Sequence, residues 1–201
     1  MSFKEGVTIS LSAREQAFEL SALNAEPLDL SNHLPFRVAV VSNLLALNRD
    51  LSIRSLSNLE PRELRVLLNI GSYMPIKSAD IAYQSRIDSS NVSRAVKVLL
   101  TKQLISAEPD PASKNIKYLS LTELGSRLYE QLISAIEPRA QALESVLSAK
   151  ERKCLFQCLT KIEAKAEQLL AQQALSFVNQ GLEIPADQKE LLRWYKKSQD
   201  Q

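Results

Sequence analysis

Small polar and basic side chains follow one another between residues 89 and 97. The groups among them that could bind nucleic acid belong to Ser89, Ser90, Asn91, Ser93, Arg94 and Lys97. An Asn amide can pair with the edge of adenine and an Arg guanidinium with guanine, while hydroxyl groups can bond to base edges or phosphates. We therefore expect Asn91 and Arg94 to contact bases, and the other four to contact phosphates or both.

The spacing of apolar residues predicts a helix over 90–102 that presents these groups on one side. Val92, Val96 and Leu99 fall on one face of this helix, and Arg94 and Lys97 fall on the opposite face. Such a helix can enter a major groove with its apolar side packed on the protein. An ordinary solvated surface helix has the same pattern, so periodicity by itself leaves both interpretations open.

The neighbouring segments predict a helix-turn-helix followed by a hairpin. We expect helices over 61–70 and 79–84, a turn at 86–88, and strands over 105–108 and 116–121. The loop 109–115 is rich in turn-forming residues, which predicts a long hairpin tip. Further contacts to phosphates or to a flanking minor groove are expected from Lys77, Ser78, Arg86, Lys114, Asn115 and Lys117.

Helices are also predicted on both sides of this region. They span residues 12–23, 35–54, 123–147, 149–174 and 186–197. The helix 35–54 carries an apolar stripe wider than one packing partner needs, which indicates a subunit interface. The fold class is therefore mainly α, with a short β-hairpin.

Composition and charge exclude several classes of protein. The chain has 201 residues, of which 45% are hydrophobic and only four are glycine, a balance that favours helices. The net charge is +2, but residues 58–121 hold nine Lys and Arg against six Asp and Glu, a local excess of +3. No apolar run is long enough to span a membrane, and we see no secretion signal. We expect a cytoplasmic protein.

Residues that could catalyse a reaction or hold a metal do not cluster in the sequence. There is no Gly-rich phosphate loop, nucleophile motif or acid–base pair, so we expect neither an enzyme nor a cofactor. His33 is the only histidine, and no other ligands have zinc spacing. Cys154 and Cys158 are predicted to be buried packing residues, within the chain or at a subunit interface, with a redox sensor as the alternative. Trp194 and Tyr195 are predicted to pack on the protein body.

Residues 34–172 resemble the MarR family of bacterial transcription regulators. The motifs that carry the resemblance lie, in order, at 59–67, 77–82, 87–94, 99–105, 110–111 and 119–125. The strand that ends in Leu121-Thr122 before a helix with Gly125 is the most specific of them.

The resemblance implies a winged helix-turn-helix over 56–122 and helices at 34–55 and 123–174 that build a homodimer. It also implies binding to a pseudo-palindromic operator in double-stranded DNA and release by a small-molecule effector. Arg37 and Tyr73 are the polar residues expected to face an effector pocket. The extensions 1–33 and 175–201 lie outside the resemblance.

Two positions depart from the family pattern. The wing carries Ser113, Lys114 and Asn115 where the family usually has Asp followed by Arg, and Lys fits a narrow minor groove less well than Arg. Gln103 stands where the family favours Gly, which predicts strain if the backbone there is left-handed. The resemblance implies a ligand-responsive repressor. The near-neutral net charge and the missing wing Arg leave open the alternative of a protein-interaction module that binds DNA weakly.

Overall fold

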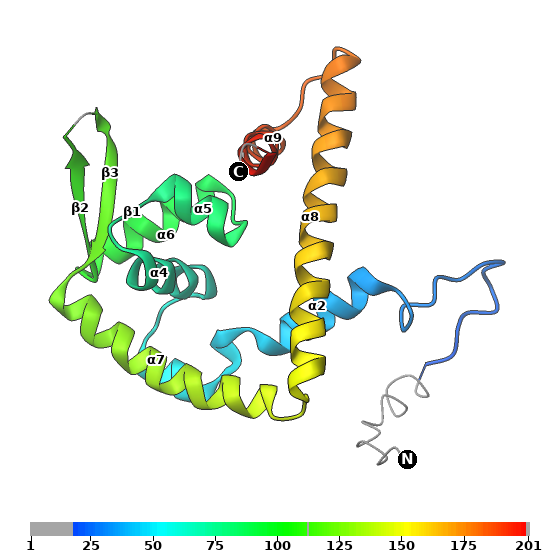
Figure 1. Cartoon of the computed structure of the whole chain (residues 1–201), viewed down its shortest axis with the longest axis horizontal. Helices are drawn as coiled ribbons and strands as arrows, with labels where there is room; N and C mark the ends of the chain where they lie inside the picture. Colours follow the sequence, from blue (N-terminus) through cyan, green and yellow to red (C-terminus); the bar gives the residue numbers. More distant parts are fainter. Residues whose placement is uncertain (1–17, 112, 200–201) are drawn as a thin grey trace. The chain divides into compact units, whose positions relative to one another are not determined.

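A computed structural model describes residues 18–111 and 113–199 of the chain (Figure 1). The chain divides into two compact units, with the boundary along the sequence between Arg49 and Asp50. The N-terminal unit contains helix α2 (Leu34–Leu45) and a short 3-10 helix, η1 (Leu47–Arg49). The structure describes all twelve residues of α2, and none of them is buried within the chain.

Two sequence predictions for the N-terminal part are wrong. The helix expected over 12–23 is turn and coil at residues 18–23, and its beginning lies outside the described residues. The helix expected over 35–54 is interrupted, because Ala46 adopts an extended conformation and Asp50 starts a new helix. The Asp50 carboxylate accepts hydrogen bonds from the backbone N–H groups of Ser52 and Ile53, which satisfies donors that would otherwise lack partners.

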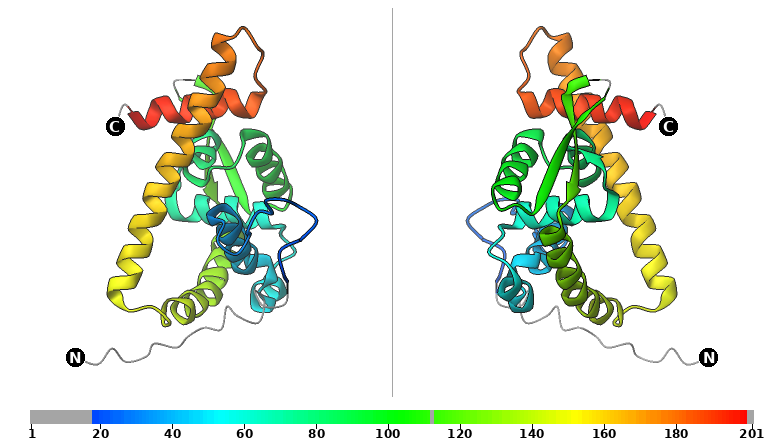
Figure 2. Two further views of the ribbon diagram at one scale, coloured as in Figure 1. Left: turned by 90° about the vertical axis from the view of Figure 1, so that its right-hand side faces the viewer. Right: turned by 90° about the vertical axis from the view of Figure 1, so that its left-hand side faces the viewer.

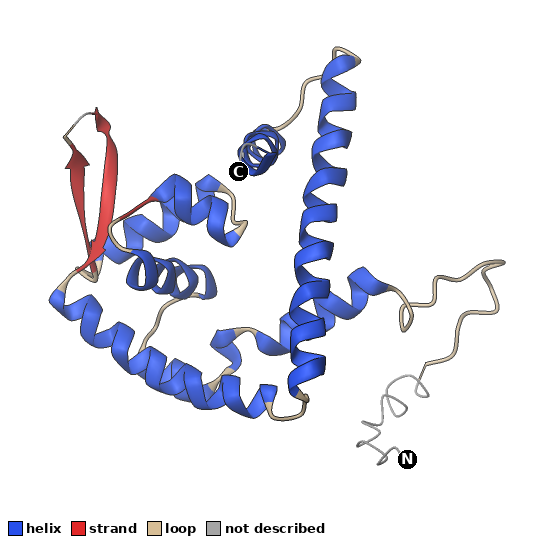
Figure 3. Cartoon of the chain, viewed as in Figure 1, coloured by secondary structure: helices blue, strands red, loops and turns tan. Residues whose placement is uncertain are grey.

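The C-terminal unit contains the remaining helices and strands (Figure 3). In chain order they are α3 (Leu51–Leu56), α4 (Pro61–Tyr73), β1 (Ile76–Lys77), α5 (Ser78–Ser85), α6 (Ser89–Thr101), β2 (Ile105–Asp110), β3 (Ser113–Leu121), α7 (Glu123–Glu144), α8 (Ala149–Asn179) and α9 (Ala186–Gln199). This order of helices and strands confirms the predicted winged helix-turn-helix and the mainly helical class. The last three helices also begin where the sequence predicts, and α8 runs five residues further than expected.

The strands form an antiparallel sheet in the order β1-β3-β2, and the β2–β3 hairpin projects beyond α5 and α6 as the wing (Figure 2). Ile76 pairs with Leu119, and Ile105 pairs with Leu121. The strands extend into the predicted loop 109–115, which shortens the tip. Pro109 can lie in β2 because this strand is at the edge of the sheet, where a missing N–H leaves no ladder bond unmade.

The apolar faces of α4, α5 and α6 form the core of the winged domain. Its fully buried side chains include Leu64, Val66, Leu67, Ile70, Ile81, Val92 and Leu99. The helix α4 continues through Gly71 to Tyr73, three residues beyond the predicted end at residue 70. A Cβ atom on Gly71 would lie 2.3 Å from the ring of Tyr129, so this glycine makes room for an aromatic side chain of α7.

A compact junction connects the wing to α7. Gln103 has a positive φ of 57°, as the family pattern implies, and Thr122 donates hydrogen bonds to the carbonyl groups of Gln103 and Leu104. The Thr122 hydroxyl accepts a bond from the N–H of Gly125. A Cβ atom on Gly125 would lie 1.8 Å from the Leu104 carbonyl oxygen, so only glycine allows the first turn of α7 to approach this backbone.

We expect Gly125→Ala to lower the free energy of unfolding by roughly 1–3 kcal/mol, because the added methyl group must displace backbone at a packed junction. Urea unfolding followed by circular dichroism measures the change. Glu130→Ala, an exposed substitution in the same helix, is the control. An unchanged unfolding midpoint for Gly125→Ala would contradict the predicted contact.

Candidate nucleic-acid interface

The recognition helix α6 begins at a strong N-terminal cap. The Asp88 carboxylate accepts hydrogen bonds from the Ser90 hydroxyl and from the backbone N–H and side-chain amide of Asn91. These bonds, that from Ser90 above all, lower the pKa of Asp88 from 3.8 to about 2. The sequence predicts either Asp88 or Ser89 as the N-terminal cap of this helix, and the structure has Asp88, which fixes the first turn of α6.

The outer face of α6 carries the polar groups that the sequence predicted there. Ser90, Ser93, Arg94 and Lys97 are exposed, whereas the apolar face of the helix packs against α4 and α5. This arrangement confirms the predicted amphipathic orientation. The exposed groups lie on one rigid helix, so they can approach a nucleic acid together.

Asn91 connects two arginines at this surface. Its side-chain oxygen accepts hydrogen bonds from Arg94, at 2.9 Å, and from Arg62 of α4, at 3.2 Å. Its side-chain nitrogen donates to Asp88. The amide is therefore engaged on both sides, and it orients Arg94. Sequence reasoning missed Arg62, which is exposed in the first turn of α4. Its position directly after Pro61, at the predicted start of the helix, could have indicated an exposed basic residue.

Arg86 lies in the turn of the helix-turn-helix and points toward the C-terminal helices. It has a positive φ of 52°, and its guanidinium forms ion pairs with Glu163, at 3.5 Å, and with Glu167, at 3.2 Å, both in α8. The same guanidinium stacks over the ring of Tyr83 at 4.5 Å. Its predicted contact with phosphate would have to compete with these carboxylates.

The N-terminus of α6 contacts a carboxylate of α9. Glu190 accepts hydrogen bonds from the backbone N–H of Ser89, at 3.0 Å, and from its hydroxyl group. Glu190 is buried, and Lys197 of the same helix pairs with Asp80 of α5 at 3.2 Å. Sequence reasoning missed this contact, because nothing in the pattern of α9 indicates which helix it packs on.

The remaining predicted contact residues lie at β1 and the wing. Lys77 pairs with Asp110 at 3.8 Å and lies over the ring of Tyr118 at 4.8 Å; its hydrogen bond with Tyr118 raises its pKa. Ser78 is half-buried at the start of α5, and Lys117 is exposed in β3. Lys114 and Asn115 belong to β3, although the structure does not describe their side chains.

Other residues singled out in the sequence have mixed outcomes. Cys154 and Cys158 are exposed thiols, as is every residue of α8 from 149 to 166 exposed within this chain. Their burial against the rest of the chain is therefore wrong, and their burial at a subunit interface stays a prediction. Trp194 and Tyr195 are half-buried, as predicted. Among residues 18–111 and 113–199, His33 included, no group of three or more His, Cys, Asp or Glu could hold a metal ion.

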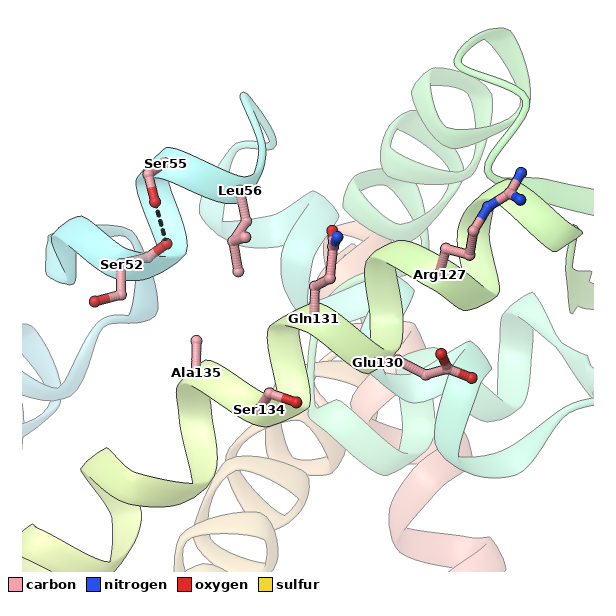
Figure 4. A pocket seen from close by; sticks show the side chains of 8 residues that line it. All are labelled: Ser52, Ser55, Leu56, Arg127, Glu130, Gln131, Ser134 and Ala135. Carbon is pink, nitrogen blue, oxygen red and sulfur yellow. Dashed lines mark hydrogen bonds between the residues drawn. The ribbon is translucent and has the colours of Figure 1, made fainter.

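The residues proposed for an effector pocket lie in different units of the chain. Arg37 is half-buried in α2, and Tyr73 is exposed at the end of α4, where its hydroxyl accepts a bond from Gln84. A separate cavity of about 610 Å³ lies between α3 and α7 (Figure 4). Most of the residues that line it have polar side chains; the lining consists of Ser52, Ser55, Leu56, Arg127, Glu130, Gln131, Ser134 and Ala135.

Comparison with known proteins agrees with this architecture. The sequence model of the MarR family matches residues 59–117. A MarR/EmrR family regulator from Acinetobacter sp. ADP1 is 24% identical, with a TM-score of 0.64 over 70% of this chain and 99% of the other. A MarR regulator from Listeria monocytogenes, solved with a 26mer DNA, is 23% identical, with a TM-score of 0.62 over 77% and 98%. PcaV from Streptomyces coelicolor, solved with its natural ligand, is 19% identical, with a TM-score of 0.60 over 70% and 99%.

No protein with a curated description is similar enough to match. The segment 59–117 is thus similar in sequence to the MarR family, and the chain has the fold of the solved MarR-family transcription regulators. In the part of the chain that the structure describes, no helix has the length and apolar character needed to cross a bilayer.

The Asp88 cap makes stability depend on pH. Because the folded-state pKa is lowered, the ionised cap stabilises the fold above about pH 4, and this contribution is lost as the pH falls toward 2. We expect Asp88→Ala to cost about 1 kcal/mol near neutral pH. The difference in unfolding free energy between variant and parent, measured by urea unfolding, should narrow as the pH falls from about 5 to about 2. A difference that stays constant over this range would contradict the assignment.

Proposed function

We propose that this chain is a cytoplasmic, homodimeric transcription regulator that binds a pseudo-palindromic operator in double-stranded DNA and is not an enzyme. The exposed polar face of α6, held outward by its buried apolar face, is the observation that carries the proposal. The DNA complex of the Listeria monocytogenes protein shows that this fold can bind DNA in a relative. Two copies of α6 would enter successive major grooves, about 34–36 Å apart.

Within this proposal, Arg94 reads a base edge and its neighbours position it. An Arg guanidinium bonds to guanine in a fixed two-pronged geometry, so its orientation matters. Asn91 provides that orientation through its bonds to Arg94 and Arg62. Ser90, Ser93 and Lys97 contact phosphates, and Lys77, Ser78, Lys114, Asn115 and Lys117 extend these contacts toward the wing.

We expect Arg94→Ala to weaken specific DNA binding by roughly 1–3 kcal/mol, with a smaller effect on nonspecific DNA. Fluorescence anisotropy with DNA from upstream of the chain's own gene, at several salt concentrations, measures both affinities. Arg127→Ala, which removes an exposed arginine of α7, is the control. If neither specific nor nonspecific affinity changes in Arg94→Ala, Arg94 does not contact DNA.

The alternative, a protein-interaction module with weak DNA binding, has one observation in its favour. Ser89 donates a hydrogen bond to Glu190, and Arg86 forms an ion pair with Glu167. Both Ser89 and Arg86 were expected to contact phosphates. The salt dependence of binding separates the alternatives. A DNA-binding protein releases counterions and loses affinity steeply as salt rises, whereas a chain that lacks specific DNA binding shows no operator preference at any salt concentration.

The proposed homodimer is supported by an apolar face of α8. Leu155, Phe156, Leu159 and Ile162 follow helical spacing on the exposed half of this helix, and Phe156 is 53% exposed. Apolar patches of this kind mark association surfaces in soluble proteins. The helix α2 carries further exposed apolar residues, which include Leu34, Val38, Val41 and Leu44.

We expect Phe156→Asp to shift the chain from dimer to monomer, because a charge at an apolar interface loses its hydration without gaining a partner. Sedimentation velocity at micromolar concentration measures the change. Gln157→Asp introduces the same charge at the adjacent exposed position and should leave the dimer intact. A dimer unaffected by Phe156→Asp would place the interface elsewhere.

Regulation by a small molecule is the final part of the proposal, with repression released when the effector binds. PcaV was solved with its natural ligand, which shows that the fold can hold a ligand in a relative. Arg37 and Tyr73 remain the predicted effector contacts. The cavity between α3 and α7 offers hydroxyl, amide and guanidinium groups that suit a polar molecule.

A further inference from the structure

A second cavity, of about 400 Å³, lies where α8 and α9 meet the turn of the helix-turn-helix. It is large enough for a small organic molecule. Its charged lining consists of Arg86, Asp88, Glu163, Glu167, Asp187 and Glu190. The cavity lies outside the places where the sequence predicted a ligand, since it depends on the C-terminal extension.

The charges around this cavity are unbalanced. Five carboxylates line it, and Arg86 is the single basic residue in the same lining. Arg86 already pairs with Glu163 and Glu167. Within the lining alone the carboxylates outnumber the basic groups by four, although Arg94 of α6 offsets part of the charge of Asp88. Partly desolvated carboxylates raise the free energy of the fold unless a cation lies near them. The lining therefore favours a positively charged occupant.

The buried carboxylate of Glu167 provides independent support. This residue is 8% exposed, and its Oε2 atom accepts bonds from Arg86, at 3.2 Å, and from the Ser198 hydroxyl, at 3.4 Å. Its Oε1 atom is also buried, and no donor among the described residues bonds to it. A buried carboxylate oxygen without a donor is unfavourable, and a bound ammonium group would supply that donor.

The rest of the lining indicates the kind of cation. Within the described residues, these carboxylates do not form a cluster that could hold a metal ion. Leu170, Leu191 and Trp194 provide an apolar wall, and the indole ring already lies 5.7 Å from the guanidinium carbon of Arg86. Aromatic faces attract organic cations, and aliphatic side chains pack on their apolar bodies.

We propose that this cavity binds an amphipathic organic cation, a protonated amine joined to an aromatic or aliphatic body. The ammonium group donates to Glu167, and the apolar body packs against Leu191 and Trp194. No covalent step is involved.

Occupation of the cavity is coupled to the recognition helix. Its walls include both α9 and the residues that precede α6, so a bound amine holds the two together. In this arrangement Glu190 bonds to Ser89, at the helix end where a DNA phosphate would otherwise bind. A ligand that stabilises the state with the Glu190–Ser89 bond lowers the affinity of the chain for a DNA phosphate at the same helix end. The amine should therefore weaken DNA binding, a consequence that rests on the proposed function.

Trp194 is the only tryptophan in the chain, so its fluorescence reports directly on the cavity. Probes of similar size are 2-phenylethylamine, neutral 2-phenylethanol and anionic 3-phenylpropionate. We expect a saturable change with the amine at concentrations at least about tenfold lower than with the alcohol, and none with the anion. Equal curves for amine and alcohol, or no change up to about 10 mM amine, would overturn the proposal.

Substitutions locate the binding site. Glu167→Gln keeps the shape of the side chain and should weaken amine binding by about tenfold or more. Glu163→Gln, at a side chain that is 61% exposed, should weaken it less and serves as a second variant that leaves the interior intact. Glu183→Gln, whose side chain is 91% exposed outside the cavity, should bind as the parent does. Amine binding unaffected by both Glu167→Gln and Glu163→Gln would show that the cation binds elsewhere.

The coupling is tested by DNA anisotropy with and without 2-phenylethylamine, and sodium chloride at equal concentration corrects for ionic strength. The parent should lose several-fold in DNA affinity, and Glu167→Gln should not. An amine that binds but leaves DNA affinity unchanged or higher would overturn the coupling. A chain that binds the amine and no DNA would instead contradict the proposed function while the cavity assignment stands.

Discussion

The burial of one face of α6 is the constraint on which the rest of the site depends. Val92 and Leu99 are fully buried against α4 and α5, so the helix cannot rotate without exposing them to water. Each buried aliphatic side chain of this kind contributes on the order of 1.5–3 kcal/mol. The rotation of α6 decides which polar groups face outward, and the Asp88 cap decides where the helix begins. Together these two features place Arg94 at the surface on a rigid support.

Local patterns were sufficient to predict the winged domain. The periodicity of α6, the cap at Asp88, the turn at residue 86 and the Thr122 start of α7 all depend on residues that are close in sequence. The left-handed backbone at Gln103 was likewise implied by the family pattern. Helix ends were less predictable: α4 continues through Gly71, where the ring of Tyr129, 58 residues away in sequence, lies against the backbone.

The part of the site that sequence analysis missed depends on contacts between distant segments. Glu190 bonds to Ser89 across 101 residues, and Glu167 pairs with Arg86 across 81. Neither carboxylate lies in a motif, and each reads as an ordinary solvated charge on its own helix. The exposure of Cys154 and Cys158 was missed for a similar reason, since an apolar helix face in the sequence does not reveal whether it packs within the chain. Side-chain contacts between segments that are distant in sequence therefore cannot be predicted from local sequence patterns.

The bridge from Arg62 through Asn91 to Arg94 has a consequence for how binding preference can change. The guanidinium that would read a base is oriented by a residue of another helix, through an amide that both arginines share. A replacement at position 94 alone would leave Arg62 and Asn91 arranged for the former side chain. Among proteins with this bridge, a change in the preferred DNA sequence should thus require substitutions at positions 62, 91 and 94 together. A redesign of the protein for a new DNA half-site should change these three residues as one unit.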